Sequence, residues 1–258
     1  MRLFCFGMGY VASYFAKALP WQNVVGTHRA DFPLNYAMLE SLRTATHILH
    51  SIPPTAEGDF VLNLQPHILN ASWFGYLSTT GVYGNHNGGW VNENTPISPN
   101  NDRSIWRANA ESAWLASTLP VNVFRLSGIY GAKRNVLEDL QSGTAKRIDK
   151  PNQYFSRIHV EDIVQILAKS LTIKGEVFNC ADDLPCPQAQ VVEYATQLLG
   201  ISPPPLVKLE DANLSKMALS FYSSSRRVEN SKIKQMLGVK LKYPTYKQGL
   251  NELFYKGK

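Results

Sequence analysis

Residues 3–19 read LFCFGMGYVASYFAKAL, and this stretch decides the fold. Its first four residues are apolar, which is typical of a short buried strand. Gly7 and Gly9 follow, and apolar residues then recur between residues 11 and 19 with the spacing of one helix face. A strand, a tight glycine turn and a helix form the opening unit of a dinucleotide-binding fold.

Gly7, Gly9 and Ala12 make a GxGxxA motif between this strand and this helix. In such a motif the first glycine makes the turn, the second lets the backbone approach a pyrophosphate, and the small third residue lets helix and strand pack. The helix N-terminus then faces the anion. We therefore expect a cofactor site at Gly7, Gly9, Tyr10 and Ala12, with a plain glycine turn as the alternative.

The end of the second predicted strand, at residues 24–27, indicates which dinucleotide binds. A site that selects NAD usually has Asp or Glu there, about 20 residues past the glycines, to accept hydrogen bonds from the ribose. This chain has Thr27 and Arg29 instead, and a hydroxyl and a basic side chain suit a 2′-phosphate. NADP(H) is the expected cofactor. Asp31 keeps NAD as an alternative, and a solvated surface role for Arg29 is another.

Strands and helices alternate along the rest of the chain. Short apolar runs predict strands at 47–52, 73–78, 121–126 and 177–180. Apolar residues with helical spacing predict helices at 58–70, 105–117, 136–141, 158–171, 187–199 and 231–237. Residues 28–46 are too few for a regular helix, another strand and their loops, so one element is expected to be abbreviated. The alternation predicts an α/β fold with a doubly wound, Rossmann-type parallel sheet.

The composition excludes several classes of protein. The chain has 258 residues, of which 44% are apolar and 18% charged, as in ordinary globular domains. No run approaches the roughly 18 uncharged apolar residues of a membrane helix. Cys5, Cys180 and Cys186 lack CxxC spacing, which favours a reducing cytoplasm over a disulfide framework. The net charge of +6 comes from dispersed basic residues, which favours a small anionic ligand over nucleic acid.

Four motifs in this order resemble the extended short-chain dehydrogenase/reductases, the superfamily that includes the NAD-dependent epimerases and dehydratases. They are the GxGxxA near the start, STTGVYG at 78–84, RLSGIYG at 125–131 and RIHVEDI at 157–163. The similarity runs from about residue 3 to NCAD at 179–182 and continues faintly into KIKQMLG at 232–238.

The resemblance implies a two-part architecture. We expect a dinucleotide-binding Rossmann domain at 1–131 and 157–182, and a smaller, mainly C-terminal substrate-binding lobe at 132–156 and 183–258. The ligands should lie across the carboxyl ends of the strands, at the switch point of the sheet. The implied activity is that of an NADP(H)-dependent oxidoreductase, or of an epimerase- or dehydratase-like enzyme. Its substrate would be small or nucleotide-linked, sugars included, and the cofactor would carry the hydride chemistry.

The resemblance also implies catalytic positions. The family places a Ser or Thr four residues before the Tyr of its VYG motif, and Thr79 stands there. The family also has YxxxK on a helix, often with a Glu four residues after the Lys. If Glu111 is that Glu, Arg107 takes the Lys position and Arg103 takes the Tyr position. The chain therefore lacks the Tyr-Lys dyad and resembles an atypical branch of the family.

The missing tyrosine matters because the family uses it to pass a proton to or from the substrate oxygen. Arginine cannot be deprotonated in that role. Arg107 would still bond the nicotinamide ribose, and Arg103 would bind an anion. Tyr83 and Tyr130 are candidate proton donors, although tyrosines that end apolar strands often only pack. Tyr130 and Ser51 are further expected cofactor contacts.

Two alternatives remain open. A protein that kept the dinucleotide site and lost catalysis would serve as a redox sensor or a partner-binding protein, and the missing tyrosine supports this reading. Glu111 would also make a surface pair with Arg107, which would leave Arg103 and Arg107 as ordinary surface residues.

The remaining motifs add little chemistry. His47 and His50 lie three apart on a predicted strand and so point to opposite faces, and no metal site is expected. His159 starts a predicted helix and is expected to bond nearby backbone. Asn230 is a plausible N-cap. Related proteins often dimerise through the helices that flank the Tyr-Lys motif, so a homodimer is a further expectation.

Overall fold

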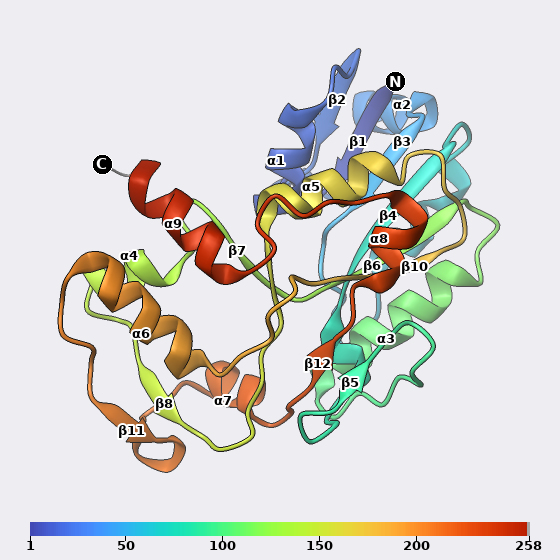
Figure 1. The fold of residues 1–258 in the computed structure, drawn as a ribbon. Helices are drawn as coiled ribbons and strands as arrows, with labels where there is room; N and C mark the ends of the chain where they lie inside the picture. The colour runs from blue at the N-terminus through green and yellow to red at the C-terminus, as the bar shows by residue number, and fades with distance from the viewer. Residues whose placement is uncertain (257–258) are drawn as a thin grey trace.

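A six-stranded parallel sheet forms the centre of the larger domain in the computed structural model, which describes residues 1–256 (Figure 1). Its strand order is β10-β6-β4-β3-β1-β2. The strands are β1 (Arg2–Phe6), β2 (Asn23–Gly26), β3 (His47–His50), β4 (Trp73–Thr79), β6 (Val121–Leu126) and β10 (Val177–Cys180). Every pairing between them is parallel. The predicted Rossmann-type sheet is confirmed.

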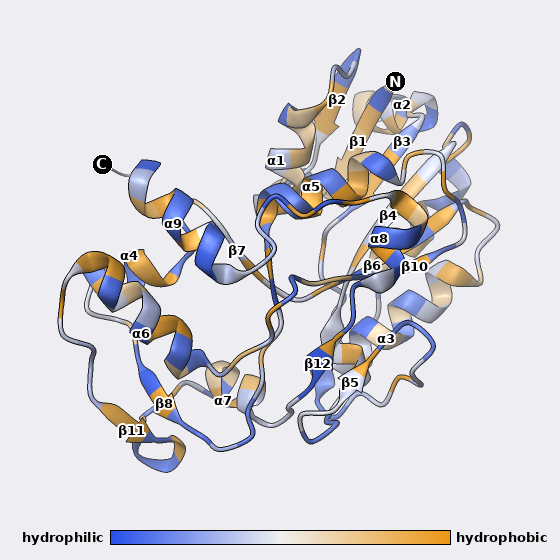
Figure 2. Ribbon diagram, in the orientation of Figure 1, coloured by the Kyte–Doolittle hydropathy of each residue, from blue (hydrophilic) through white to orange (hydrophobic). Residues whose placement is uncertain are grey.

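Helices cover both faces of this sheet. One face carries α1 (Tyr10–Ala18), α5 (Val160–Lys169) and α8 (Ser231–Leu237), and the other carries α2 (Tyr36–Thr44), the 3-10 helix η2 (Phe60–His67) and α3 (Asp102–Leu115). Successive side chains of a strand point to opposite faces. Leu3 and Cys5 therefore enter the first core, and Phe4 and Phe6 enter the second. The buried strands are correspondingly apolar in Figure 2.

The segment between β2 and β3 is abbreviated, as its length predicts. It holds only the 3-10 helix η1 (Arg29–Asp31) and α2. No strand extends the sheet beyond β2 among residues 1–256, and β3 returns to pair with β1 on the side away from β2. The sheet order therefore reverses between β1 and β3, which is where such folds bind ligands.

The smaller lobe lies beside the sheet domain (Figure 1). Its helices are α4 (Val136–Gln141), α6 (Gln188–Leu199), the 3-10 helix η4 (Leu209–Asp211), α7 (Lys216–Tyr222) and α9 (Tyr246–Lys256). Its strands β8 (Arg147–Asp149) and β11 (Leu206–Lys208) pair with each other. A separate core around Leu137, Val192 and Leu250 holds this lobe together. The strands β7 (Gly128–Tyr130) and β9 (Arg157–His159) pair where the chain enters and leaves it.

The lobe is less continuous in sequence than expected. β12 (Arg227–Val228) pairs with β5 (Trp90–Val91), which follows η3 (Thr80–Tyr83) in the larger domain. Ile233 and Leu237 of α8 are buried in the first core of the sheet domain. The expected lobe boundary at 183–258 is therefore wrong for this segment, because the apolar face of α8 packs on the sheet.

Two helix ends follow their sequence signals, and one helix start does not. Gly200 and Gly238 end α6 and α8 with φ of 68° and 59°, in the left-handed region that glycine adopts readily. Asn230 precedes α8 but makes no side-chain cap. Its amide instead donates to the Ala181 carbonyl at 2.9 Å and to the Asp183 carboxylate at 2.6 Å, so it ties α8 to the end of β10.

Candidate active site

The glycine turn after β1 is held by two hydroxyl groups. Gly7 has φ of +84°, and a Cβ there would lie 2.9 Å from Ile52 Cγ1, so the fold itself requires glycine. The Gly7 N–H donates to Thr27 Oγ1 at 2.9 Å, and Ser51 Oγ donates to the Gly7 carbonyl at 2.6 Å. Thr27 and Ser51 therefore fix the shape of the turn.

Gly9 stands at the start of α1 for a different reason. Its φ of −83° suits any residue. A Cβ built there would meet only Ser51 Oγ, at 4.0 Å. The protein itself leaves the space in front of Gly9 open, which fits a residue that lets a ligand approach the backbone. Ala12, one turn later, is fully buried and lets α1 pack on the sheet.

The expected role of Thr27 is wrong. Its side chain is fully buried, and its hydroxyl accepts from Gly7 and donates to the Cys5 carbonyl at 3.4 Å. It therefore has no hydroxyl left for a 2′-phosphate. Arg29 is exposed on η1 and makes no hydrogen bond within residues 1–256, whereas Asp31 accepts from the His28 N–H at 2.6 Å. Of the two residues predicted to contact a 2′-phosphate, Thr27 and Arg29, only Arg29 has a side chain without a hydrogen bond in the described chain.

A cleft of about 1100 Å³ runs from the glycine turn to the smaller lobe. Gly9, Tyr10 and Ser51 lie at one end, and residues of α7 lie at the other. The basic residues that line it are Arg103, Arg107, Arg134, Lys146, Arg157 and Arg226. Among the described residues that line the cleft, none is Asp or Glu. A cleft lined by one sign of charge concentrates ligands of the opposite sign.

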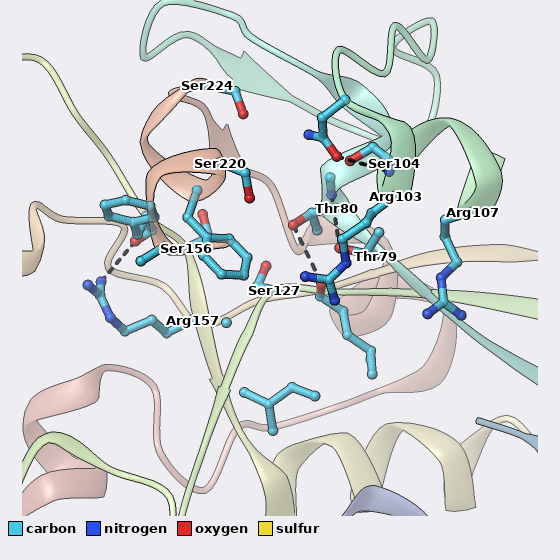
Figure 3. A pocket seen from close by; sticks show the side chains of 18 of the residues that line it. Thr79, Thr80, Arg103, Ser104, Arg107, Ser127, Ser156, Arg157, Ser220 and Ser224 are labelled. Atoms are coloured by element: carbon cyan, nitrogen blue, oxygen red, sulfur yellow. Dashed lines mark hydrogen bonds between the residues drawn. The ribbon is translucent and has the colours of Figure 1, made fainter. Parts of the chain in front are cut away.

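Thr79 and Thr80 bring hydroxyl groups into this cleft at the carboxyl end of β4 (Figure 3). Thr79 Oγ1 accepts from the Gly81 N–H at 3.1 Å, which leaves its hydroxyl hydrogen available for a ligand. Thr80 Oγ1 donates to the Leu126 carbonyl at 3.5 Å. The structure thus places Thr79 where the family resemblance implies it.

Arg103 and Arg107 both line the cleft from the first turns of α3, but they differ in their contacts. Arg107 Nη1 donates to the Leu77 carbonyl at 2.8 Å and to the Tyr76 hydroxyl at 3.3 Å, so it braces the end of β4. Arg103 makes no hydrogen bond or ion pair within the described chain. Figure 3 shows its side chain directed into the cleft.

Glu111 does not pair with Arg107, so the alternative of a surface pair between them is wrong. Glu111 is 2% exposed, accepts from Ser78 Oγ at 2.8 Å and forms a buried ion pair with Arg125. Arg125 lies 14 residues after Glu111 in the chain, on β6 rather than on α3. Because this pair joins a helix to a strand, residue spacing along the helix could not predict it.

Tyr83 extends the same buried network. Its hydroxyl accepts from Arg125 Nη1 at 2.8 Å and donates to Asn179 Oδ1 at 2.8 Å. Burial raises its pKa, and it does not line the cleft. Tyr83 is therefore a packing residue, which was the stated alternative, and its candidate role as a proton donor is not supported.

Tyr130 does not line the main cleft either. It borders a smaller hollow of about 390 Å³ beside α4, and its buried hydroxyl has no partner within the described residues. Burial also raises the pKa of Tyr130. The expected contact of Tyr130 with a cofactor in the main cleft is not supported.

No sequence signal predicted several of the residues that line the cleft. Tyr154, Tyr222 and Arg226 lie in segments without motif or periodicity, so only the folded chain brings them to the cleft. Tyr10 is placed as expected, and its hydroxyl donates to the Ala132 carbonyl at 2.8 Å. The Arg134 guanidinium lies 5.8 Å from the Tyr10 ring centre, at the end of the cleft beside the glycine turn.

Two buried titratable groups lie near the junction with the lobe. His159 Nδ1 accepts from the Glu161 N–H at 3.2 Å, which confirms its predicted bond to nearby backbone, and burial lowers its pKa to about 4. Asp182, 1% exposed, follows β10. Its Oδ1 accepts from Leu184 N–H at 3.2 Å, whereas Oδ2 has no partner in residues 1–256. Burial raises the pKa of Asp182 to about 7.

Asp182→Asn should change how stability depends on pH. The pKa of Asp182 rises from 3.8 to about 7 on folding, so the folded protein binds more protons between these pH values. The contribution of Asp182 to the free energy of unfolding therefore falls as the pH rises from about 4 to 7. The variant should be more stable than wild type at pH 8, with the difference shrinking towards pH 4. Urea unfolding at pH 4, 6 and 8 measures this.

The exposed Asp149→Asn variant is the control for this experiment, and its difference from wild type should stay small at every pH. A pH-independent difference between Asp182→Asn and wild type would contradict the proposed titration.

Comparison with solved structures identifies relatives of this fold. A functionally unknown conserved protein from Silicibacter pomeroyi DSS is 41% identical, with a TM-score of 0.89 over 100% of this chain and 99% of that chain. The chain belongs to the same family as that protein. No protein-family model and no curated protein matches this sequence.

More distant structures share the fold. The dTDP-glucose 4,6-dehydratase of Streptomyces venezuelae, solved with NAD and TYD bound, is 17% identical with a TM-score of 0.77, over 100% of this chain and 98% of that one. The UDP-glucuronic acid 4-epimerase of Bacillus cereus, in complex with NAD, is 13% identical with a TM-score of 0.79, over 99% of both chains. These structures share the Rossmann-type fold of this chain, which is the fold that the sequence motifs predict.

Within residues 1–256, no group of three or more His, Cys, Asp or Glu side chains is arranged to hold a metal ion. No helix in this part of the chain is both long and apolar enough to cross a membrane.

Proposed function

We propose that this protein is an NADP(H)-dependent oxidoreductase, or an epimerase- or dehydratase-like enzyme, that acts on a small or nucleotide-linked anionic substrate. The observation that carries the proposal is the single cleft that joins the open backbone at Gly9 to a basic, acid-free substrate end. The distant structural neighbours are solved with NAD, which supports a nicotinamide dinucleotide.

The residues present fit such a cofactor. The open space at Gly9 and the free N-terminus of α1 suit a pyrophosphate, and Arg134 adds a cation beside Tyr10. The bound nicotinamide would supply or accept hydride. Thr79 would orient a substrate oxygen through its free hydroxyl hydrogen. Arg107 would hold the end of β4 in place for this contact.

A catalytically degenerate NAD(P)-binding sensor or partner-binding protein is the second candidate. The observation that favours it is the position of Arg103 in the cleft, where the family has its tyrosine. A measurement of turnover distinguishes the enzyme from the sensor. A panel of carbonyl and sugar-nucleotide substrates would be followed by NADPH absorbance and product analysis, with Thr79→Ala as the comparison. Consumption that slows in Thr79→Ala supports the enzyme, whereas tight cofactor binding without turnover supports the sensor.

NADPH should bind at least about tenfold tighter than NADH. The free Arg29 would make a charge-assisted contact to the 2′-phosphate, worth on the order of 1.5 to 3 kcal/mol. Arg29→Ala should lower the affinity for NADPH to that for NADH. Titration of both cofactors by intrinsic fluorescence measures the two affinities.

Arg2→Ala is the matched control for this prediction. Arg2 is exposed at the amino end of β1, away from the edge where ligands bind, so its loss should change neither affinity. Equal affinities of wild type for NADPH and NADH would reject the NADP(H) preference and leave NAD as the cofactor.

We also propose a cytoplasmic location and a homodimer. The first is supported by Cys5, Cys180 and Cys186, which are buried and free. The second rests on the family resemblance, and sedimentation analysis of the purified protein tests it.

A further inference from the structure

None of the basic residues that line the cleft has an acidic partner within residues 1–256. Lys146 donates to the carbonyls of Ala212 and Asn213 at 2.7 and 2.8 Å, and Arg157 donates to Gln188 Oε1 at 2.8 Å. These contacts are hydrogen bonds to neutral groups and not ion pairs with an acidic side chain. The substrate end of the cleft is therefore an electrostatic site for an anion.

Arg226 differs from the other basic residues of the cleft because one of its buried nitrogen atoms lacks a hydrogen bond within residues 1–256. It is half-buried just before β12, and its Nη1 donates to the Gly84 carbonyl at 2.8 Å and to Ser224 Oγ at 3.2 Å. Its Nε is buried with no partner within the described chain. Burial lowers its pKa to about 10. A desolvated guanidinium with an unmade hydrogen bond is costly unless an anion offsets it.

Arg103 faces the same cleft from the larger domain. Its guanidinium has no hydrogen-bond or ion-pair partner among residues 1–256. Figure 3 shows it directed into the cleft, while Ser220 and Ser224 lie on the lobe side. This pair of arginines is separate from the cofactor end. Gly9 follows β1, whereas Arg226 bonds Gly84, beyond the end of β4, and β4 lies two strands away from β1 in the sheet.

We propose that Arg226 and Arg103 together bind an oxyanion of the substrate, either a phosphate or a carboxylate. A guanidinium presents a planar fork of N–H groups that matches both kinds of oxyanion. The two arginines are far apart in the chain, and the fold brings both to the same cleft. This inference rests on the proposed function, since it assigns the substrate end of the same cleft.

The test is calorimetric titration of the protein, saturated with NADPH, with inorganic pyrophosphate and separately with malonate. Saturation fills the cofactor end, so the probes report on the substrate end. Wild type should bind one probe more tightly, which identifies the oxyanion as phosphate or carboxylate. Arg226→Gln and Arg103→Gln should each weaken that binding about tenfold or more, with unchanged NADPH affinity.

Arg227→Gln is the control, because Arg227 is the chain neighbour of Arg226 but does not line the cleft. It should bind the probe as wild type does. Thermal unfolding checks that each variant is folded, and Arg103→Gln keeps the test valid if Arg226→Gln is unstable, because Arg103 is exposed. Absence of binding of both probes to wild type, or unchanged binding in folded variants, would overturn the proposal.

Failure of the proposed function gives a different result. If NADPH does not bind wild type, the titrations are run without it, and Gly9→Val is added. Probe binding that is lost in Arg226→Gln and kept in Gly9→Val would still support the oxyanion site. Binding that is lost only in Gly9→Val would place the anion at the glycine turn and overturn the site.

Discussion

Gly9→Val should abolish NADPH binding while the protein stays folded. The added side chain meets no protein atom closer than 4.0 Å at its Cβ, so the fold tolerates it. The same side chain would occupy the space through which a pyrophosphate approaches the start of α1. Loss of two charge-assisted hydrogen bonds there corresponds to a decrease in affinity of roughly 100-fold or more. Fluorescence titration with NADPH measures the affinity, and thermal unfolding measures the stability.

Two other variants are the controls for Gly9→Val. Ala18→Val adds the same kind of bulk at the exposed last residue of α1 and should leave NADPH affinity unchanged. Gly7→Val should instead destabilise the protein, because its φ of +84° and the 2.9 Å approach to Ile52 are incompatible with a side chain. Unchanged NADPH affinity in a folded Gly9→Val protein would remove the basis for a dinucleotide site at this turn.

Glu111→Ala should lower the free energy of unfolding by about 3 to 5 kcal/mol. The substitution leaves the Arg125 guanidinium buried without its counter-charge and removes the acceptor of the Ser78 hydroxyl. Arg125 also donates to Tyr83, so η3 and the neighbouring Thr79 should become less ordered. Urea unfolding followed by circular dichroism measures the loss of stability.

Glu40→Ala is the control for the buried pair. Glu40 pairs with Arg43 on the surface of α2, where each side chain is about 40% exposed, so its removal should cost at most about 0.5 kcal/mol. A Glu111→Ala protein that is no less stable than Glu40→Ala would show that the Arg125 charge is solvated rather than buried.

The fold was predictable because its signals are local. The strand, the glycines and the helix at residues 3–19 predict the first unit. The alternation of strand-like apolar runs with helix-like apolar spacing predicts the parallel sheet. The length of the segment at 28–46 was enough to predict a missing element, because about 20 residues hold only one helix and its turns.

The candidate site was predictable only in part. The motif at 78–84 placed Thr79 in the cleft, and the glycine motif placed Gly9 beside open space. The same sequence reasoning assigned the Thr27 hydroxyl to a phosphate, although the turn itself uses it. A residue type at the right spacing indicates which chemistry is available, but not whether a neighbour already occupies its hydrogen bonds.

The sequence by itself determined the parallel sheet and the glycine turn, because each depends on residues close together in the chain. The tertiary structure alone decided that Glu111 pairs with Arg125, that Tyr83 bonds Asn179, and that Arg226 reaches the cleft with its Nε unpartnered among residues 1–256. Tyr83 and Asn179 are 96 residues apart, and Arg226 and Gly84 are 142 apart. Such partners meet only when helices and strands pack and bring distant side chains together. A local sequence pattern therefore cannot predict them.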